Sequence, residues 1–223
     1  MQPRLVPVAD RALLVELGDT VGDRVQALVW ALDRALQAHP VPGQVELVPA
    51  MVNLLVVFDL LVTDHAAVAA AVRSRLAGLD DRAGDGAERE VLVCYDPPFA
   101  PDLEKVADQA GLTAEAVIAA HLAGAYRVAM YGFAPGYAYL SGVPEPIRLP
   151  RKAAPVRGVP AGSVIIAGGQ CLVTTLTMPT GWWVIGRSAT RILTGQEDRP
   201  FLFDVGDRVR FRRVSAAEME RGA

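Results

Sequence analysis

The spacing of hydrophobic residues changes along the chain from helical to strand-like. Between Asp23 and Ala38, apolar residues recur three and four positions apart, as on the buried side of an amphipathic helix. Capping residues indicate three further helices, because Asp64 precedes residues 66–78, Pro101 begins residues 102–111 and Thr113 precedes residues 114–124.

Short apolar runs in the first 95 residues predict strands between these helices. The runs cover residues 5–8, 12–16, 44–49, 53–59 and 90–95, and the first two form either two strands or one interrupted strand. With a single interrupted strand, the order is β-α-β-β-α-β. This order is typical of a ferredoxin-like α/β sandwich, which we therefore expect over residues 1–95.

The remainder of the chain, residues 96–223, is expected to form a second domain. Two helices lead it, and helical periodicity is absent after them. Short β-like runs separated by Gly and Pro follow, at residues 126–131, 163–167, 171–176, 182–185 and 208–214. This pattern predicts a β-barrel or sandwich, so the whole chain is assigned to the α+β class.

Composition excludes several classes of protein. The chain has 223 residues, 52% of them hydrophobic, a formal charge of -3 and a pI near 5.6, which argues against general affinity for nucleic acid or anionic membranes. It shows neither an export signal nor an apolar run long enough to span a membrane, so a cytoplasmic location is expected. Cys94 and Cys171 are expected to be buried free thiols, and no residues have metal-ligand spacing.

Common catalytic motifs are also missing from the sequence. It contains no GxxxxGK[ST] phosphate loop, HExxH pair, GxSxG elbow or Rossmann glycine pattern after a strand. A stand-alone nucleotide or hydrolase site of those types is therefore disfavoured.

The strongest candidate for a ligand site is the segment from Pro144 to Pro160. Five prolines restrict its backbone, and it carries Arg148, Arg151, Lys152 and Arg157 against one acid, Glu145. Such a segment can form a rigid anion-binding lip, although a solvated surface loop is equally consistent with its composition. Lys152 is notable because the chain has only one other lysine, Lys105.

Four further positions have two interpretations each. Ser163 can orient a substrate or cap a turn, and His121 can carry a proton or pack in the last turn of its helix. Trp182 and Trp183 are predicted to lie on opposite faces of a strand, one in the barrel and one toward a groove or partner, close to Arg187.

The order of these motifs closely resembles the allophanate hydrolase subunit 1 family, also called KipI or the B subunit of 5-oxoprolinase. The resemblance rests on GFAPGYAYL (132–140), PRKAAPVRGVPAGS (150–163), TGWWVIGR (180–187) and GDRVRF (206–211). PVADRALLVELG, VPAMVNLLVVFD and CYDPPFAPDLEKVA extend it over nearly the whole chain. The chain departs from the family pattern in three ways. Tyr137 replaces a phenylalanine, Thr180 replaces a glycine, and Val156 stands where the family has arginine, with Arg157 directly after it.

The resemblance implies a ferredoxin-like N-terminal domain and a cyclophilin-like C-terminal barrel. It also implies an ATP-dependent hydrolase, supplied with Mg-ATP in the assembled complex, that opens 5-oxoproline to glutamate. Its partners would be a homologous subunit 2, which is the C subunit of 5-oxoprolinase, and a possible third subunit. In this interpretation a small anionic substrate meets catalytic residues His121, Arg151, Lys152 and Arg157. Its binding residues are Phe133, Gly136, Tyr137, Tyr139, Ser163, Trp182 and Arg187.

Two other functions remain open within the same resemblance. Some members are similar to inhibitors of sensor histidine kinases, which would use the aromatic and arginine surface for binding only. Others resemble the carboxyltransferase part of enzymes that act on urea-derived substrates, which would require a biotin carrier.

Overall fold

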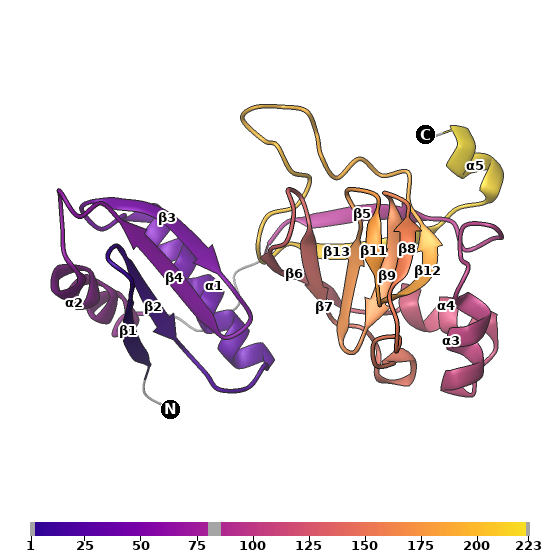
Figure 1. Cartoon of the computed structure of the whole chain (residues 1–223), viewed down its shortest axis with the longest axis horizontal. Helices are drawn as coiled ribbons and strands as arrows, with labels where there is room; N and C mark the ends of the chain where they lie inside the picture. The colour runs from indigo at the N-terminus through magenta and orange to yellow at the C-terminus, as the bar shows by residue number, and fades with distance from the viewer. Residues whose placement is uncertain (1–2, 80–85, 222–223) are drawn as a thin grey trace. The chain divides into compact units, whose positions relative to one another are not determined.

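The computed structural model describes residues 3–79 and 86–221, which fall into two compact units, residues 1–85 and 86–223 (Figure 1). In the described part of the chain, no helix is both long and apolar enough to cross a membrane. Each unit has its own hydrophobic core, so each is described by itself.

The first unit is a four-stranded antiparallel sheet with two helices. Its elements are β1 (Arg4–Val8), β2 (Ala12–Glu16), α1 (Asp23–Ala38), β3 (Gln44–Pro49), β4 (Asn53–Phe58) and α2 (His65–Leu76). The strand order is β1-β2-β4-β3. Alternate residues of β2 and β4, such as Leu13 and Val56, are buried in one cluster with Val29 and Leu32 of α1 and Val72 of α2. The period-two and period-3.6 patterns therefore place one sheet face and one helix face in the same core.

The ferredoxin-like arrangement expected for residues 1–95 is not confirmed. Residues 4–16 form two separate strands, and the expected last strand, β5 (Glu88–Val93), leaves this unit. It pairs in parallel with β13 (Arg208–Arg213) along its whole length. The boundary between the units consequently falls after residue 85, and the expected boundary after residue 95 is wrong.

The second unit is built on a seven-stranded sheet that curves into a barrel. Its order is β12-β9-β10-β7-β6-β13-β5, and a bridge between Cys94 and Arg187 joins the two ends. The remaining elements are α3 (Leu103–Ala110), α4 (Ala114–Leu122), β6 (Tyr126–Tyr131), β7 (Ala138–Ser141), the 3-10 turn η1 (Glu145–Ile147), β8 (Val156–Val159), β9 (Ser163–Ala167), β10 (Gln170–Val173), β11 (Met178–Thr180), β12 (Trp183–Arg187) and α5 (Ala216–Arg221). A mixed α+β chain with a barrel-like sheet agrees with the sequence prediction.

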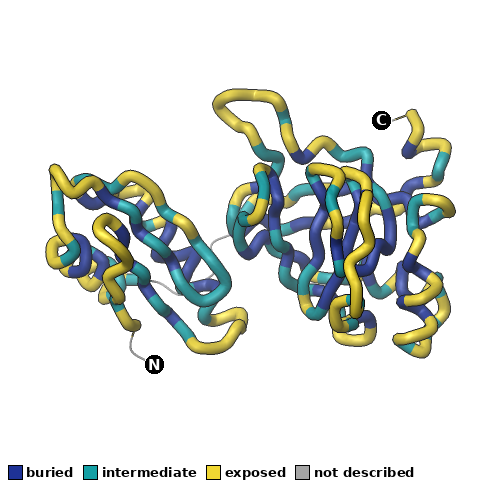
Figure 2. Tube along the Cα trace, viewed as in Figure 1, coloured by how far each residue is buried: buried dark blue, intermediate teal, exposed yellow. Residues whose placement is uncertain are grey.

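Three neighbouring barrel strands, β9, β10 and β12, bury both of their faces. Val164 and Ile166 of β9 belong to the interior core, whereas Ile165 belongs to a second cluster outside it. In the same way Trp183 packs inside the barrel and Trp182 outside it, as the alternation predicts. The two-stranded sheet of β8 and β11 contributes Val159 and Met178 to the outer cluster. Figure 2 shows β9, β10 and β12 as largely buried, in contrast to the exposed part of the loop between β12 and β13.

The capping residues Asp64 and Thr113 are confirmed, whereas Pro101 lies one residue before the N-cap Asp102 and is outside α3. The hydroxyl of Thr113 accepts a hydrogen bond from the N–H of Ala116 at 3.2 Å, and the carboxylate of Asp64 accepts one from Ala67 at 2.8 Å. Gly111 ends α3 in the left-handed conformation with φ 66°. Both cysteines are free and buried, as expected.

Candidate functional site

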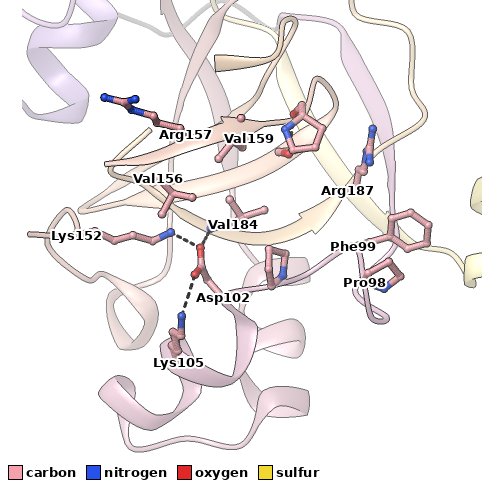
Figure 3. Close-up of a pocket in the computed structure, with 14 residues that line it drawn as sticks. Pro98, Phe99, Asp102, Lys105, Lys152, Val156, Arg157, Val159, Val184 and Arg187 are labelled. Atoms are coloured by element: carbon pink, nitrogen blue, oxygen red, sulfur yellow. Dashed lines mark hydrogen bonds and ion pairs between the residues drawn. The ribbon is translucent and has the colours of Figure 1, made fainter. Parts of the chain in front are cut away.

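A cavity of about 340 Å³ lies on the second unit, within the size range of small-ligand sites (Figure 3). Three parts of the chain form it: the segment that leads into α3, the proline-rich segment with β8, and β12. The lining residues are Pro98, Phe99, Pro101, Asp102, Lys105, Lys152, Val156, Arg157, Gly158, Val159, Pro160, Ser163, Val184 and Arg187. The wall is thus largely apolar, with four cations and one acid.

Asp102 is the single acid of this cavity. Only 6% of the residue is exposed, and its carboxylate accepts a hydrogen bond from the N–H of Val184 at 2.9 Å. Oδ2 of the same carboxylate forms an ion pair with Nζ of Lys152, and Oδ1 lies 3.9 Å from Nζ of Lys105. Figure 3 shows both lysines directed toward Asp102 from different elements.

Lys152 is held along its whole length. Its side chain is 11% exposed, and its ammonium lies 5.4 Å from the ring centroid of Trp183. Its backbone N–H donates to the carbonyl of Gly181 at 2.7 Å, while the indole N–H of Trp183 donates to the carbonyl of Pro150 at 2.8 Å. The proline-rich segment is therefore fastened to the barrel at this point, and its role in binding an anion stays a prediction.

Two arginines line other parts of the cavity. Arg157 lies on β8, is exposed, and extends away from Asp102 in Figure 3. Arg187 ends β12, where its backbone makes the bridge to Cys94, and its side chain is partly buried. No acid of the described residues forms an ion pair with either guanidinium, so both charges are available to an anion.

Ser163 lines the cavity but has a structural hydrogen bond. It is 1% exposed, and its hydroxyl donates to the carbonyl of Pro160 at 2.7 Å. Thr174 donates to the same carbonyl at 2.9 Å, so the turn before β9 is closed by two hydroxyls. This geometry agrees with the turn-capping interpretation of Ser163, and its role toward a substrate stays a prediction.

The aromatic residues of the segment 132–142 form a row with Trp182. Ring centroids are separated by 5.2 Å between Phe133 and Tyr137, 5.8 Å between Tyr137 and Tyr139, and 6.0 Å between Tyr139 and Trp182. The guanidinium of Arg151 lies 5.6 Å from the Trp182 ring centroid and continues the row. We call these five side chains the aromatic row.

The aromatic row differs in exposure from one end to the other. Phe133 is 71% exposed and has φ 70°, which is unusual for a residue other than glycine. Tyr137 is buried, its hydroxyl donates to Sδ of Met178 at 3.1 Å, and burial raises the pKa of this phenol to about 12. Gly136 has φ 71°, and a Cβ there would lie 2.6 Å from Cδ2 of Leu193, so its role is to permit this close packing.

The cavity and the aromatic row are neighbours that do not share one hollow. None of the described rings in the row lines the cavity, and neither does Arg151. Val159 and Val184 connect the two, because both line the cavity and both belong to the hydrophobic cluster of Tyr137 and Trp182. The candidate residues thus divide into a charged cavity and a ring surface on the other side of these valines.

The proposed role of His121 as a proton carrier is not supported by its position. The residue is fully buried in the barrel interior, where Nδ1 lies 2.7 Å from the hydroxyl of Tyr95 and Nε2 lies 3.5 Å from Sγ of Cys171. Burial lowers the pKa of this imidazole to about 3, because the charged form would lose its hydration. His121 is a core residue, and it does not line the cavity.

Sequence reasoning missed Asp102 and Lys105. Both look like ordinary residues at the start of a helix, and their pattern contains no sign of a ligand site. The one available signal is composition: the chain has two lysines, and the structure brings both to the same carboxylate.

Comparison with known proteins identifies the family. Residues 3–203 match the family described as carboxyltransferase domain, subdomain C and D. The chain belongs to this family.

Similar proteins of known name include the B subunit of 5-oxoprolinase from Bacillus subtilis, which is 36% identical over 93% of this chain and 91% of its own length. The B subunit of the same enzyme from Escherichia coli O157:H7 is 34% identical over 92% of this chain and 93% of its own. The crystal structure of TTHA0988 superposes with a TM-score of 0.81 at 34% identity, over 93% of this chain and 40% of that longer chain.

Proposed function

We propose that the chain is a subunit of an ATP-dependent 5-oxoprolinase that opens 5-oxoproline to glutamate together with a homologous partner subunit. Support comes from relatives named as the B subunit of 5-oxoprolinase, which are 33–36% identical over more than nine-tenths of this chain. Those names favour a complex in which this chain works with others.

The charged cavity is the observation that carries this proposal. 5-Oxoproline combines a carboxylate with a small ring that has apolar faces. The cavity offers Lys105, Lys152 and Arg187 for the carboxylate, and Val156 and Val184 for the ring. Charge-assisted contacts to a carboxylate are each worth about 1.5–3 kcal/mol, which suits recognition of a small anion.

The residues of this chain would bind, orient and shield the substrate. Lys152, held by Asp102, presents a fixed ammonium to negative charge on the substrate, and Arg187 supplies a planar donor at the other end of the cavity. The apolar wall of prolines and valines excludes water, which strengthens each of these contacts. The aromatic row would then meet the substrate from outside or contact the partner protein.

ATP would supply the activation that a lactam needs, since phosphorylation of the amide oxygen would make the ring carbon more open to attack by water. The ring C–N bond would then break to release the amine, and phosphate would leave as the new carboxylate forms. The cations of the cavity fit phosphate oxygens as well as a carboxylate, but the sequence has no glycine-rich phosphate loop. We therefore assign Mg-ATP to the assembled complex, and no step is attributed to an ATP site within this chain.

The test is coexpression of the chain with its partner subunits, followed by measurement of ADP release that depends on 5-oxoproline. Lys152→Met is expected to lower kcat/KM by about 10-fold or more, whereas Arg191→Met, which removes an exposed charge away from the cavity, is not. A stable complex with no turnover would count against the proposal.

Carboxyl transfer to a urea-derived substrate is a second candidate, favoured by the family's own description as a carboxyltransferase domain. Such a reaction needs a biotinylated carrier protein. Turnover that is abolished by avidin would favour it, and 5-oxoproline-dependent ADP release unaffected by avidin would exclude it.

A further inference from the structure

The two lysines of the chain meet at one buried carboxylate. Lys105 lies on α3 and Lys152 on the proline-rich segment, and their ammonium groups approach different oxygens of Asp102. The two contacts differ in kind, because the side chain of Lys105 is 69% exposed whereas that of Lys152 is 11% exposed. Asp102 thus has one buried cation and one cation at the solvent side.

Stability alone does not account for the buried pair. Removing both charges from water is unfavourable, and well-packed apolar residues of similar size often serve as well or better. The surroundings offer such packing, since Val156 and Val184 line the same cavity and the Trp183 ring lies against Lys152. A cation kept in this position needs another explanation.

A count of donors shows what the ammonium can still do. Lys152 has three N–H donors, and Asp102 takes one of them. Asp102 is itself fixed from the backbone, because Val184 donates to its carboxylate at 2.9 Å and the Asp102 N–H donates to the Val184 carbonyl at 3.0 Å. Because Lys152 lines the cavity, its other two N–H donors are available to a ligand there.

We propose that Asp102 is a positioning residue that holds the ammonium of Lys152 in place for an anionic group of the ligand, with Lys105 as a second, more exposed cation. The ligand group is a carboxylate or a phosphate oxygen. Because this inference names the binding subsite of the proposed reaction, it rests on the proposed function.

Binding is measured without turnover, in the complex of the full chain with its partner subunits. Only this chain is labelled with ¹⁵N, and the indole N–H of Trp183 serves as the reporter because that ring lies against Lys152. Two probes are titrated separately: 5-oxoproline and inorganic phosphate. At least one is expected to shift the Trp183 signal, and a signal that neither probe moves would overturn the inference.

Three variants separate positioning from structural support: Asp102→Asn, Lys152→Met and the two combined. Asn keeps an acceptor for the Val184 N–H but loses the charge that orients Lys152. Each single change is expected to raise Kd for the bound probe by about 10- to 100-fold, and Lys105→Met by less than about 10-fold.

The double variant is decisive even if Asp102→Asn folds poorly. It leaves no unpaired buried charge, because Lys105 is largely exposed to solvent, so it is expected to fold and to bind as weakly as Lys152→Met. If Asp102 served only to neutralise a buried lysine, the double variant would instead recover binding, and the inference would be wrong.

Failure of the inference can be told apart from failure of the proposed function. If the wild type binds phosphate but not 5-oxoproline, and these variants weaken phosphate binding, the subsite is supported and the proposed substrate is wrong. If ADP release depends on 5-oxoproline but Asp102→Asn and Lys152→Met bind the probe as tightly as the wild type, the proposed function is supported and the proposed subsite is wrong.

Discussion

Gly186 passes so close to Val93 that a Cβ on the glycine would lie 2.7 Å from Cγ1 of the valine. This contact lies where β12 and the end of β5 meet and the barrel closes, beside the Cys94–Arg187 bridge. A register shift between Val184 and Gly186 bends β12 at the same place. Closure of the barrel therefore depends on the absence of a side chain at residue 186.

Gly186→Ala is expected to lower the free energy of unfolding by about 1–3 kcal/mol, because the core at Val93 cannot move aside without strain. Urea denaturation measures the change. Gly169→Ala is the control, since a Cβ there meets only the side chain of Arg148 at 3.9 Å. Equal stability of the two variants would contradict the close approach.

Asp207→Ala is expected to cost about 3–5 kcal/mol. Asp207 is 3% exposed, accepts from the N–H of Ala87 at 2.9 Å and pairs with Nε of Arg89 at 2.8 Å, so it fastens the beginning of β5 beside β13. Asp204→Ala, at a side chain that is 71% exposed, is expected to change stability by less than about 0.5 kcal/mol. Thermal or urea unfolding of both variants tests the assignment of β5 to the second unit. A small loss of stability in Asp207→Ala would contradict this assignment.

Acid is expected to destabilise the protein through His121. Burial places its pKa at about 3 in the folded chain, below the ordinary 6.5, so the unfolded chain binds a proton that the folded chain does not. The free energy of unfolding should fall as pH drops through this window, by up to about 1.4 kcal/mol per pH unit from this group. The stability advantage of the wild type over His121→Gln, measured in urea at about pH 7, 6 and 5, should shrink on acidification. If the free energies of unfolding of the two proteins changed equally with pH, His121 would become protonated in the folded chain.

Phe133→Gly is expected to be more stable than Phe133→Ala by about 1 kcal/mol, because φ 70° is strained for alanine and not for glycine. Thermal unfolding of the two variants measures the contribution of backbone strain to stability, since both variants lack the ring. Equal stability would mean that residue 133 does not keep this conformation. Under the proposed function both variants should also lower activity, because an exposed ring at the end of the aromatic row is lost.

Local features of the fold could be predicted from the sequence. The caps Asp64 and Thr113, the helix end at Gly111 and the opposite faces of Trp182 and Trp183 each depend on residues a few positions apart. Strand pairing does not. Nothing in the run 90–95 reveals that its partner is β13, more than a hundred residues later, and the order of elements alone suggested a sheet with the preceding strands.

The candidate site was predictable to the same extent. Lys152, Arg157 and Arg187 were expected from charge in a stiff segment and at a strand end, and the structure places all three around one cavity. Asp102 could not be found, because its contact with Lys152 spans 50 positions. The rings were expected to bind the substrate together with these charges. However, Trp182 and Val184 lie two residues apart on the same face, and Val184 separates the rings from the charges.

The parallel pairing of β5 with β13 also bears on synthesis. β5 has two neighbours: it pairs with β13, and the bridge from Cys94 to Arg187 connects it to β12. Both neighbours are later in the chain, so β5 leaves the ribosome long before either is synthesised. Its apolar residues, including Val91 and Val93, remain without sheet partners while most of the barrel is translated. The nascent chain is therefore exposed to aggregation at this strand until its last strand emerges, and a chaperone that binds extended apolar segments is expected to bind it there.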